Sequence, residues 1–167
     1  MEKRFMKRAV ALAKEAAAAG EIPVGAVIVK NGEIIGEGRN RRREDRTAVS
    51  HAEISAIDAA CRNIGDWRLD GCTMYVTLEP CPMCTGAVIM SRISEVVFGA
   101  YDLRSGCMDS VIDLCNYPFE SRPRIYGGIC EDECAELLSG FFTEVRKEKR
   151  KSLSAKADRL LCFYKII

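Results

Sequence analysis

The chain has 167 residues, 48% of them hydrophobic and 29% charged, which corresponds to one globular domain with a core of its own. No apolar run in the sequence approaches the roughly 20 residues that a membrane-spanning helix needs. The N-terminus is basic but lacks the separate apolar segment and cleavage site of a secretion signal, so we expect a cytoplasmic protein. The nine cysteines, an odd number, are then better explained as thiols or metal ligands than as a disulfide framework.

The net charge is only +1, but basic residues gather in two segments. Residues 39–46 contain five arginines and two acids, and residues 143–167 contain eight basic residues and three acids. Two basic segments on an otherwise acidic chain indicate a polyanionic partner, although a solvated helix end would show the same pattern.

Helical and strand-like patterns alternate along the chain. Apolar residues at steps of three and four indicate helices, and short runs rich in β-branched residues indicate strands. Asn31-Gly32 is a strong hairpin signal, and the alternation predicts an α/β sheet with helices on both faces, which the hairpin makes mixed. The elements expected in chain order are a helix over 5–17, strands over 24–30 and 33–38, a helix over 50–64, a strand over 72–78, a helix over 82–92, a strand over 95–100, a short helix over 110–115, a weak strand over 125–126 and a helix over 131–151.

The helix expected over 50–64 has an apolar stripe. The spacing of its apolar residues predicts the inner face that the helix turns toward the sheet. The residues predicted for that face are Ile54, Ile57, Ala60, Cys61 and Ile64.

The only histidine of the chain, His51, lies two residues before Glu53, and Cys81 and Cys84 follow about thirty residues later. Two thiolates three residues apart on the first turn of a helix point to the same side, and the helix N-terminus favours the thiolate form. An imidazole from a second helix N-terminus would complete three protein ligands for tetrahedral zinc and leave the fourth position for water, as in catalytic sites. Zinc lowers the pKa of such a water to about 7, and Glu53 is placed to shuttle protons.

The same residues are compatible with different roles when only the sequence is considered. Ser50 and Glu53 also fit a helix capping box. Cys81 and Cys84 could form a redox pair instead. Glu79 is a second acid that could shuttle protons, although its position at a strand end favours bonds to backbone. A structural zinc would need a fourth ligand, for which the sequence offers Cys61, Cys72, Cys107 and Cys115.

With these motifs the chain resembles the cytidine-deaminase-like zinc deaminases, whose signature is His-x-Glu followed by Pro-Cys-x-x-Cys. It is more similar still to the bacterial tRNA-specific adenosine deaminases. The similarity covers about residues 3–150, with departures at 49–50 and 107–109. The segments that carry it are 21–27, 36–40, 75–84, 91–93, 96–102, 131–138 and 141–142.

The resemblance implies a three-layer α/β/α cytidine deaminase-like fold with a mixed central sheet of about five strands. It makes His51, Cys81 and Cys84 the ligands of one zinc ion per subunit, and Glu53 the proton shuttle. The residues that it implies for contact with the substrate are Asn40, Asp102, Phe142 and Arg146.

The activity that the resemblance implies is hydrolytic deamination of adenosine to inosine at the wobble position of a tRNA anticodon, with release of ammonia. Its implied partners are the anticodon stem-loop of tRNA and a second subunit in a homodimer. One alternative is a deaminase of free guanine, cytosine or a nucleoside, which would need neither basic segment. Another is a zinc-stabilised RNA-binding module without catalysis, which would need a fourth protein ligand.

We expect two units along the chain: a zinc-dependent deaminase domain over residues 1–152 and an extension over 153–167 that the resemblance does not cover. Apolar residues of the extension recur at steps of three to four, so a short amphipathic helix is predicted. An exposed apolar stripe promotes aggregation. The extension is therefore expected to pack on its own domain or on the dimer partner.

Overall fold

The computed structural model describes the backbone of residues 2–164 and the side chains of residues 2–153. Its centre is a five-stranded sheet with the strand order β2-β1-β3-β4-β5. β1 pairs antiparallel with both β2 and β3, whereas β4 pairs parallel with β3 and β5. The strands are β1 (Gly25–Lys30), β2 (Glu33–Arg39), β3 (Thr73–Leu78), β4 (Glu95–Ala100) and β5 (Arg124–Tyr126).

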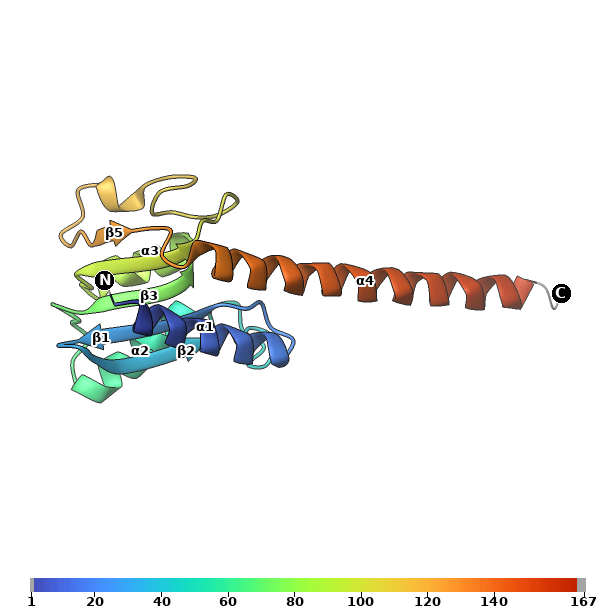
Figure 1. The fold of residues 1–167 in the computed structure, drawn as a ribbon, viewed down its shortest axis with the longest axis horizontal. Coiled ribbons are helices and arrows are strands. Elements are labelled where there is room, and N and C mark those ends of the chain that lie inside the picture. Colours follow the sequence, from blue (N-terminus) through green and yellow to red (C-terminus); the bar gives the residue numbers. More distant parts are fainter. Residues whose placement is uncertain (1, 165–167) are drawn as a thin grey trace.

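Helices cover both faces of this sheet, as Figure 1 shows. α1 and the start of α4 pack on one face, and α2 and α3 pack on the other. The predicted three-layer α/β/α arrangement with a mixed sheet is therefore confirmed. The helices are α1 (Lys3–Ala18), α2 (Ala52–Ile64), α3 (Pro82–Met90) and α4 (Glu131–Tyr164), with one 3₁₀ turn, η1 (Leu114–Asn116).

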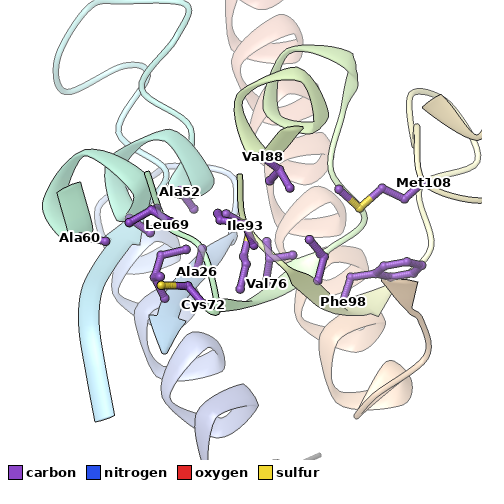
Figure 2. Packing of buried hydrophobic residues seen from close by; sticks show 14 of the residues in the cluster. Ala26, Ala52, Ala60, Leu69, Cys72, Val76, Val88, Ile93, Phe98 and Met108 are labelled. Carbon is purple, nitrogen blue, oxygen red and sulfur yellow. The ribbon is translucent and has the colours of Figure 1, made fainter. Parts of the chain in front are cut away.

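Strand side chains alternate between two hydrophobic clusters, because successive residues of a strand point to opposite faces. On β1, Val27 and Val29 join the cluster under α1, and Ala26 and Ile28 join the cluster under α2 and α3. Figure 2 shows the second cluster, which Met108 enters from the loop after β4.

The inner face of α2 differs from the predicted one. Ala52, Ala56 and Ala60 are completely buried against the sheet, and only Ala60 belongs to the predicted set. The other predicted residues lie at the margins of this face and are only partly buried: Ile54, Ile57, Cys61 and Ile64.

Glycines in β2 explain why alanines occupy this face. A Cβ atom added at Gly36 would lie 2.4 Å from the carbonyl oxygen of Ala56, and one at Gly38 would lie 2.2 Å from that of Ala52. The backbones of α2 and β2 are therefore in contact, at a separation that close-packed interiors allow only between very small residues. Large side chains such as isoleucine fit only at the edges of so close a contact.

The short helix predicted over 110–115 is wrong, since the structure has only the turn η1 there. The backbone N–H groups of residues 108–110 donate to the carboxylate of the buried Glu79. The side chain of Asp113 then caps η1 by accepting from the backbone N–H of Asn116. The buried carboxylate thus fixes the backbone that leads into the predicted helix, and the N–H groups of Val111 and Leu114 donate to the carbonyls of Gly106 and Cys107 rather than in a helical pattern.

α4 is longer than the helix predicted over 131–151. It runs from Glu131 to Tyr164 without a break, and Figure 1 shows it extending away from the sheet. Its first turns are anchored by Cys134 and Leu138, which pack against the cluster under α1. The packing predicted for 153–167 stays a prediction, and residues 165–167 lie outside the described residues. Among the described helices, none combines the length and the apolar character needed to cross a membrane.

We expect the substitution Gly38→Ala to destabilise the protein by about 1–3 kcal/mol, because the added methyl group overlaps the backbone of α2. Gly140→Ala on α4 is the matched control, since a Cβ atom there meets nothing within 4 Å. The control should be unchanged or more stable by up to about 1 kcal/mol. Urea unfolding measures both values, and equal stability of the two variants would contradict the close contact of α2 with β2.

Candidate active site

Three strands deliver the functional residues to one edge of the sheet. β2, β3 and β4 run in the same direction, so their carboxyl ends lie together. Asn40 follows β2, the segment with Cys81 and Cys84 follows β3, and Asp102 follows β4. Such an edge is the usual place for ligand sites in α/β sheets.

The N-termini of α2 and α3 meet at this edge. His51 is the N-cap residue of α2 and Cys81 is that of α3, and neither side chain caps its own helix. The Nδ1 atom of His51 lies 3.5 Å from the Sγ atom of Cys84 and 3.8 Å from that of Cys81. All three possible ligand atoms lie within 4.8 Å of one another.

This arrangement fits a tetrahedral zinc ion. With Zn–S bonds of about 2.3 Å and Zn–N bonds of about 2.0–2.1 Å, tetrahedral ligand atoms lie roughly 3.5–3.8 Å apart. Among the residues whose side chains are described, no further cysteine, histidine or acid joins the group. The four cysteines considered as a fourth ligand are therefore elsewhere, which disfavours a closed, structural zinc site.

The two thiols behave as a coupled pair. Hydrogen bonding from Cys84, with a further contribution from His51, lowers the pKa of Cys81 to about 4. The same contact with Cys81, together with burial, raises the pKa of Cys84. His51 in turn has a raised pKa, mainly because of its hydrogen bond to Cys81. A lowered pKa favours the thiolate of Cys81, which is the form of cysteine that binds a metal.

Glu53 lies in the first turn of α2 and is only 4% exposed. Burial raises the pKa of its carboxyl group, which also lies within hydrogen-bonding reach of Cys84. The alternative of a capping box is wrong, because the hydroxyl of Ser50 donates to Asp45 and the N-cap residue is His51. Glu53 is therefore free for chemistry at the cavity that it lines.

A cavity of about 180 Å³ opens beside the three ligands. Two of the predicted substrate residues, Asn40 and Asp102, line it together with Glu53. The other two, Phe142 and Arg146, do not line it and lie on exposed parts of α4. The residues around the cavity are Ile22, Val24, Asn40, Arg42, His51, Ala52, Glu53, Leu78, Glu79, Cys81, Asp102 and Ser105.

Several of these lining residues were not predicted. Ile22, Val24 and Leu78 form an apolar wall, and Arg42 and Ser105 add polar groups. Arg42 belongs to the basic segment 39–46, but nothing in the sequence distinguishes it from its neighbouring arginines. The apolar wall had a weak signal, since its residues lie at the ends of the predicted strands.

Glu79 supports one rim of the cavity. Its carboxylate is 2% exposed and accepts hydrogen bonds from four backbone N–H groups, those of residue 102 and residues 108–110, and from the hydroxyl of Ser110. Burial raises the pKa of Glu79, but these hydrogen bonds outweigh it and the net shift is downward. The prediction that Glu79 bonds backbone is confirmed. A Cβ atom at Gly106 would overlap this carboxylate, so glycine is required there.

Glu21 supports a second part of the rim in the same way, through the loop of residues 40–44. It is 2% exposed and accepts from the backbone N–H groups of Arg43 and Glu44 at 2.7 and 2.9 Å. The Nδ2 atom of Asn40 donates to its other oxygen at 3.5 Å. Glu21 thus holds both the loop of residues 40–44 and the side chain that faces the cavity.

Comparison with known proteins agrees with this site. Residues 1–100 match the family described as the cytidine and deoxycytidylate deaminase zinc-binding region. The chain is 48% identical to the tRNA-specific adenosine deaminase of Bacillus subtilis over 154 residues, which cover 90% of this chain and 96% of that protein. The chain therefore belongs to the cytidine and deoxycytidylate deaminase family, and within it to the tRNA-specific adenosine deaminases.

A second relative carries a different name. The tRNA(Ile)-lysidine synthase of Deinococcus deserti is 43% identical over 148 residues, which cover 88% of this chain. The match spans only 28% of that longer protein.

Two solved structures support the fold and the family. One comes from studies of A-to-I editing by tRNA:A34 deaminases at the wobble position of transfer RNA. It is 39% identical, with a TM-score of 0.80, and covers 82% of this chain and all of that one. The guanine deaminase of Bacillus subtilis is 37% identical, with a TM-score of 0.58, over 67% of this chain and 82% of that one. The family is a zinc-binding one, so zinc is the cofactor of this chain.

Replacement of Cys81 by serine should reduce the zinc content from close to one ion per chain to near zero, because a hydroxyl is a poor substitute for a thiolate ligand. Cys61→Ser is the matched control, since the Cys61 thiol donates to a backbone carbonyl away from the site. Metal analysis of both purified variants provides the comparison. Zinc loss in the control as large as in Cys81→Ser would show that another thiol holds the metal.

Glu79→Gln should lower stability at neutral pH by about 1–3 kcal/mol, because the amide NH₂ group would face backbone N–H groups that need an acceptor. The pKa of Glu79 in the folded protein lies below its ordinary value of 4.5. The carboxylate therefore stabilises the fold above pH 4.5 and loses this effect as the pH falls through the folded pKa. The difference between wild type and variant should narrow on acidification.

Urea unfolding over a pH series from 7 downward measures this difference. Glu136→Gln, a change at an exposed site on α4, is the control and should have the unfolding free energy of the wild type at every pH. If the stability difference between wild type and Glu79→Gln stays constant on acidification, the effect comes from packing rather than from the charge of Glu79.

Proposed function

We propose that this protein deaminates adenosine to inosine at the wobble position of a tRNA anticodon. One observation carries the proposal: a group of three zinc ligands, two of which (His51 and Cys81) line a single small cavity together with the buried Glu53 at the carboxyl edge of the sheet. The B. subtilis relative of that name and the tRNA:A34 deaminase structure support the substrate.

The size of the cavity favours a single base that has left its stack. About 180 Å³ is below the roughly 300–1,000 Å³ of sites for drug-sized ligands, so the cavity suits one flat ring system. A base must be turned out of its stack to reach such a site, and an unpaired anticodon loop allows this at low cost. The apolar wall of Ile22, Val24 and Leu78 offers contact surface for the ring.

The ligands His51, Cys81 and Cys84 would hold zinc, which supplies an acidified water for hydrolysis when bound. Glu53 would take one proton of the attacking water and pass it to N1 of the ring while the water oxygen bonds to C6. It would then move the second proton from that oxygen to the exocyclic amine, so that the C6–N6 bond breaks, ammonia leaves and C6 keeps the oxygen. Asn40 and Asp102 lie on the cavity wall, where they orient the nucleoside. Because burial raises the pKa of Glu53, the group is suited to giving protons as well as taking them.

The second candidate function is deamination of a free base. The similarity to the guanine deaminase of B. subtilis supports this function. That structure has a lower TM-score than the tRNA:A34 deaminase structure, so it is the weaker support. A deaminase of free guanine would not need the basic segments 39–46 and 143–167. A zinc-stabilised RNA-binding module is disfavoured because no fourth protein ligand joins the group among the described residues.

The proposal extends to contacts outside the cavity. Phe142 and Arg146 lie on exposed parts of α4 and would contact the anticodon stem-loop. In a homodimer a partner subunit can cover the apolar stripe predicted for residues 153–167, and light scattering of the purified protein measures the oligomeric state. The cytoplasm is the compartment that fits a tRNA substrate and thiolate ligands.

The test is incubation of the zinc-loaded protein with total bacterial tRNA, followed by nucleoside analysis for inosine, beside assays on free guanine and cytosine. We expect inosine only in the tRNA. Glu53→Gln should keep zinc but lose about 10²–10⁴ in rate, because an amide cannot carry protons. Glu33→Gln, an exposed change of the same kind, should keep full activity. Deamination of guanine in the absence of inosine in tRNA would establish the second candidate instead.

A further inference from the structure

A second cavity, of about 440 Å³, adjoins the active-site cavity. The two share Ile22, Asn40 and Arg42 as lining residues, so they meet at these side chains. The catalytic proposal above makes no use of the second cavity. Its lining residues are Glu21, Ile22, Asn40, Arg42, Arg43, Arg46, Thr47 and Ala48.

The arginines of the basic segment fall into two groups. Arg39 pairs with Glu44 at 2.8 Å, and Arg41 pairs with Asp45 at 3.0 Å, so their charges are compensated. Arg42, Arg43 and Arg46 line the second cavity, and none of them is in an ion pair among the residues whose side chains the structure describes. The uncompensated cations of the segment thus face the cavity.

The only acid in the cavity lining does not compensate them. Glu21 is 2% exposed, and its oxygens already accept from the backbone N–H groups of Arg43 and Glu44 and from the side chain of Asn40. Arg43 directs one N–H to the carbonyl of Gly20. The carboxylate therefore acts as an internal anchor for the loop, and the cavity retains an excess of positive charge.

We propose that this second cavity is a binding site for one backbone phosphate of the RNA, next to the nucleoside that enters the active-site cavity. Guanidinium groups bind phosphate through paired N–H donors. Arg42 and Arg46 both line this cavity without an ion-pair partner among the residues whose side chains are described. Because Arg42 also lines the active-site cavity, the phosphate it holds adjoins the inserted nucleotide. This inference rests on the proposed function and adds the feature that selects a nucleotide in a strand over a free base.

The first experiment measures binding of an anticodon stem-loop that carries inosine, which cannot react further, over a range of salt concentrations. Arg42→Gln and Arg46→Gln should each reduce the log–log salt slope by about 0.7, which corresponds to about fivefold weaker binding at 0.1 M salt. Arg42→Lys should keep the slope, because the charge remains. Zinc content should be unchanged in all variants.

Arg62→Gln is the matched control. It removes one arginine that pairs with Asp58 about three helical turns from His51, so it changes the net charge equally but far from the cavity. The control should retain the wild-type slope. Equal slopes for Arg42→Gln, Arg46→Gln and Arg62→Gln would overturn the phosphate site.

The second experiment locates the phosphate. Stem-loops with one uncharged methylphosphonate on either side of the target adenosine are compared with one modified in the stem. One of the two flanking modifications should weaken wild-type binding about fivefold and leave Arg42→Gln unaffected, because the same contact is already lost. Additive losses at both flanking positions would contradict the assignment. Failure of wild type to form inosine in the unmodified stem-loop would instead refute the proposed function, and the salt slopes would still decide the phosphate site.

Discussion

The close contact between the alanine face of α2 and the glycines of β2 determines where the active site can form. Because Gly36 and Gly38 allow the backbone of α2 to touch β2, the N-terminus of the helix sits directly over the carboxyl edge of the sheet. His51 is the first residue outside that helix. Its imidazole lies within 3.8 Å of the thiols of Cys81 and Cys84 at the N-terminus of α3.

Two buried glutamates fix the conformation of two loops that have no regular secondary structure. The loop after β2 and the loop after β4 cannot satisfy their backbone N–H groups in helices or strands, and buried polar groups without partners are costly. Glu21 accepts from the first loop and Glu79 from the second. Both loops carry residues of the active-site cavity, so internal carboxylates fix the geometry that the loops alone would not hold.

Much of this could be predicted from sequence because the signals were local. Alternating β-branched runs predicted the sheet, and the spacing of His51, Cys81 and Cys84 predicted the ligand set that the structure brings together. The inner face of α2 was misjudged because periodicity favours large apolar residues, whereas the face is chosen by glycines on a strand distant in sequence. The prediction of a short helix over 110–115 failed for a similar reason, since the N–H group of its first residue, Ser110, donates to Glu79, about thirty residues away. Contacts between distant residues leave no periodic pattern.

Burial and ion pairing together determine how charge is divided around the site. Inside the cavity, burial raises the pKa of Glu53, whereas a dication held by the neighbouring ligands would favour the ionised form. The pKa of this carboxyl group is thus subject to two opposing effects, which would suit the proton transfer proposed for Glu53. At the rim, ion pairs compensate the charges of Arg39 and Arg41. Arg42 and Arg46 line the second cavity without such pairs among the described side chains. The proposed reaction on one base of a polyanion would use both features: a buried acid whose pKa is subject to opposing effects, and arginines without ion-pair partners in the adjoining cavity.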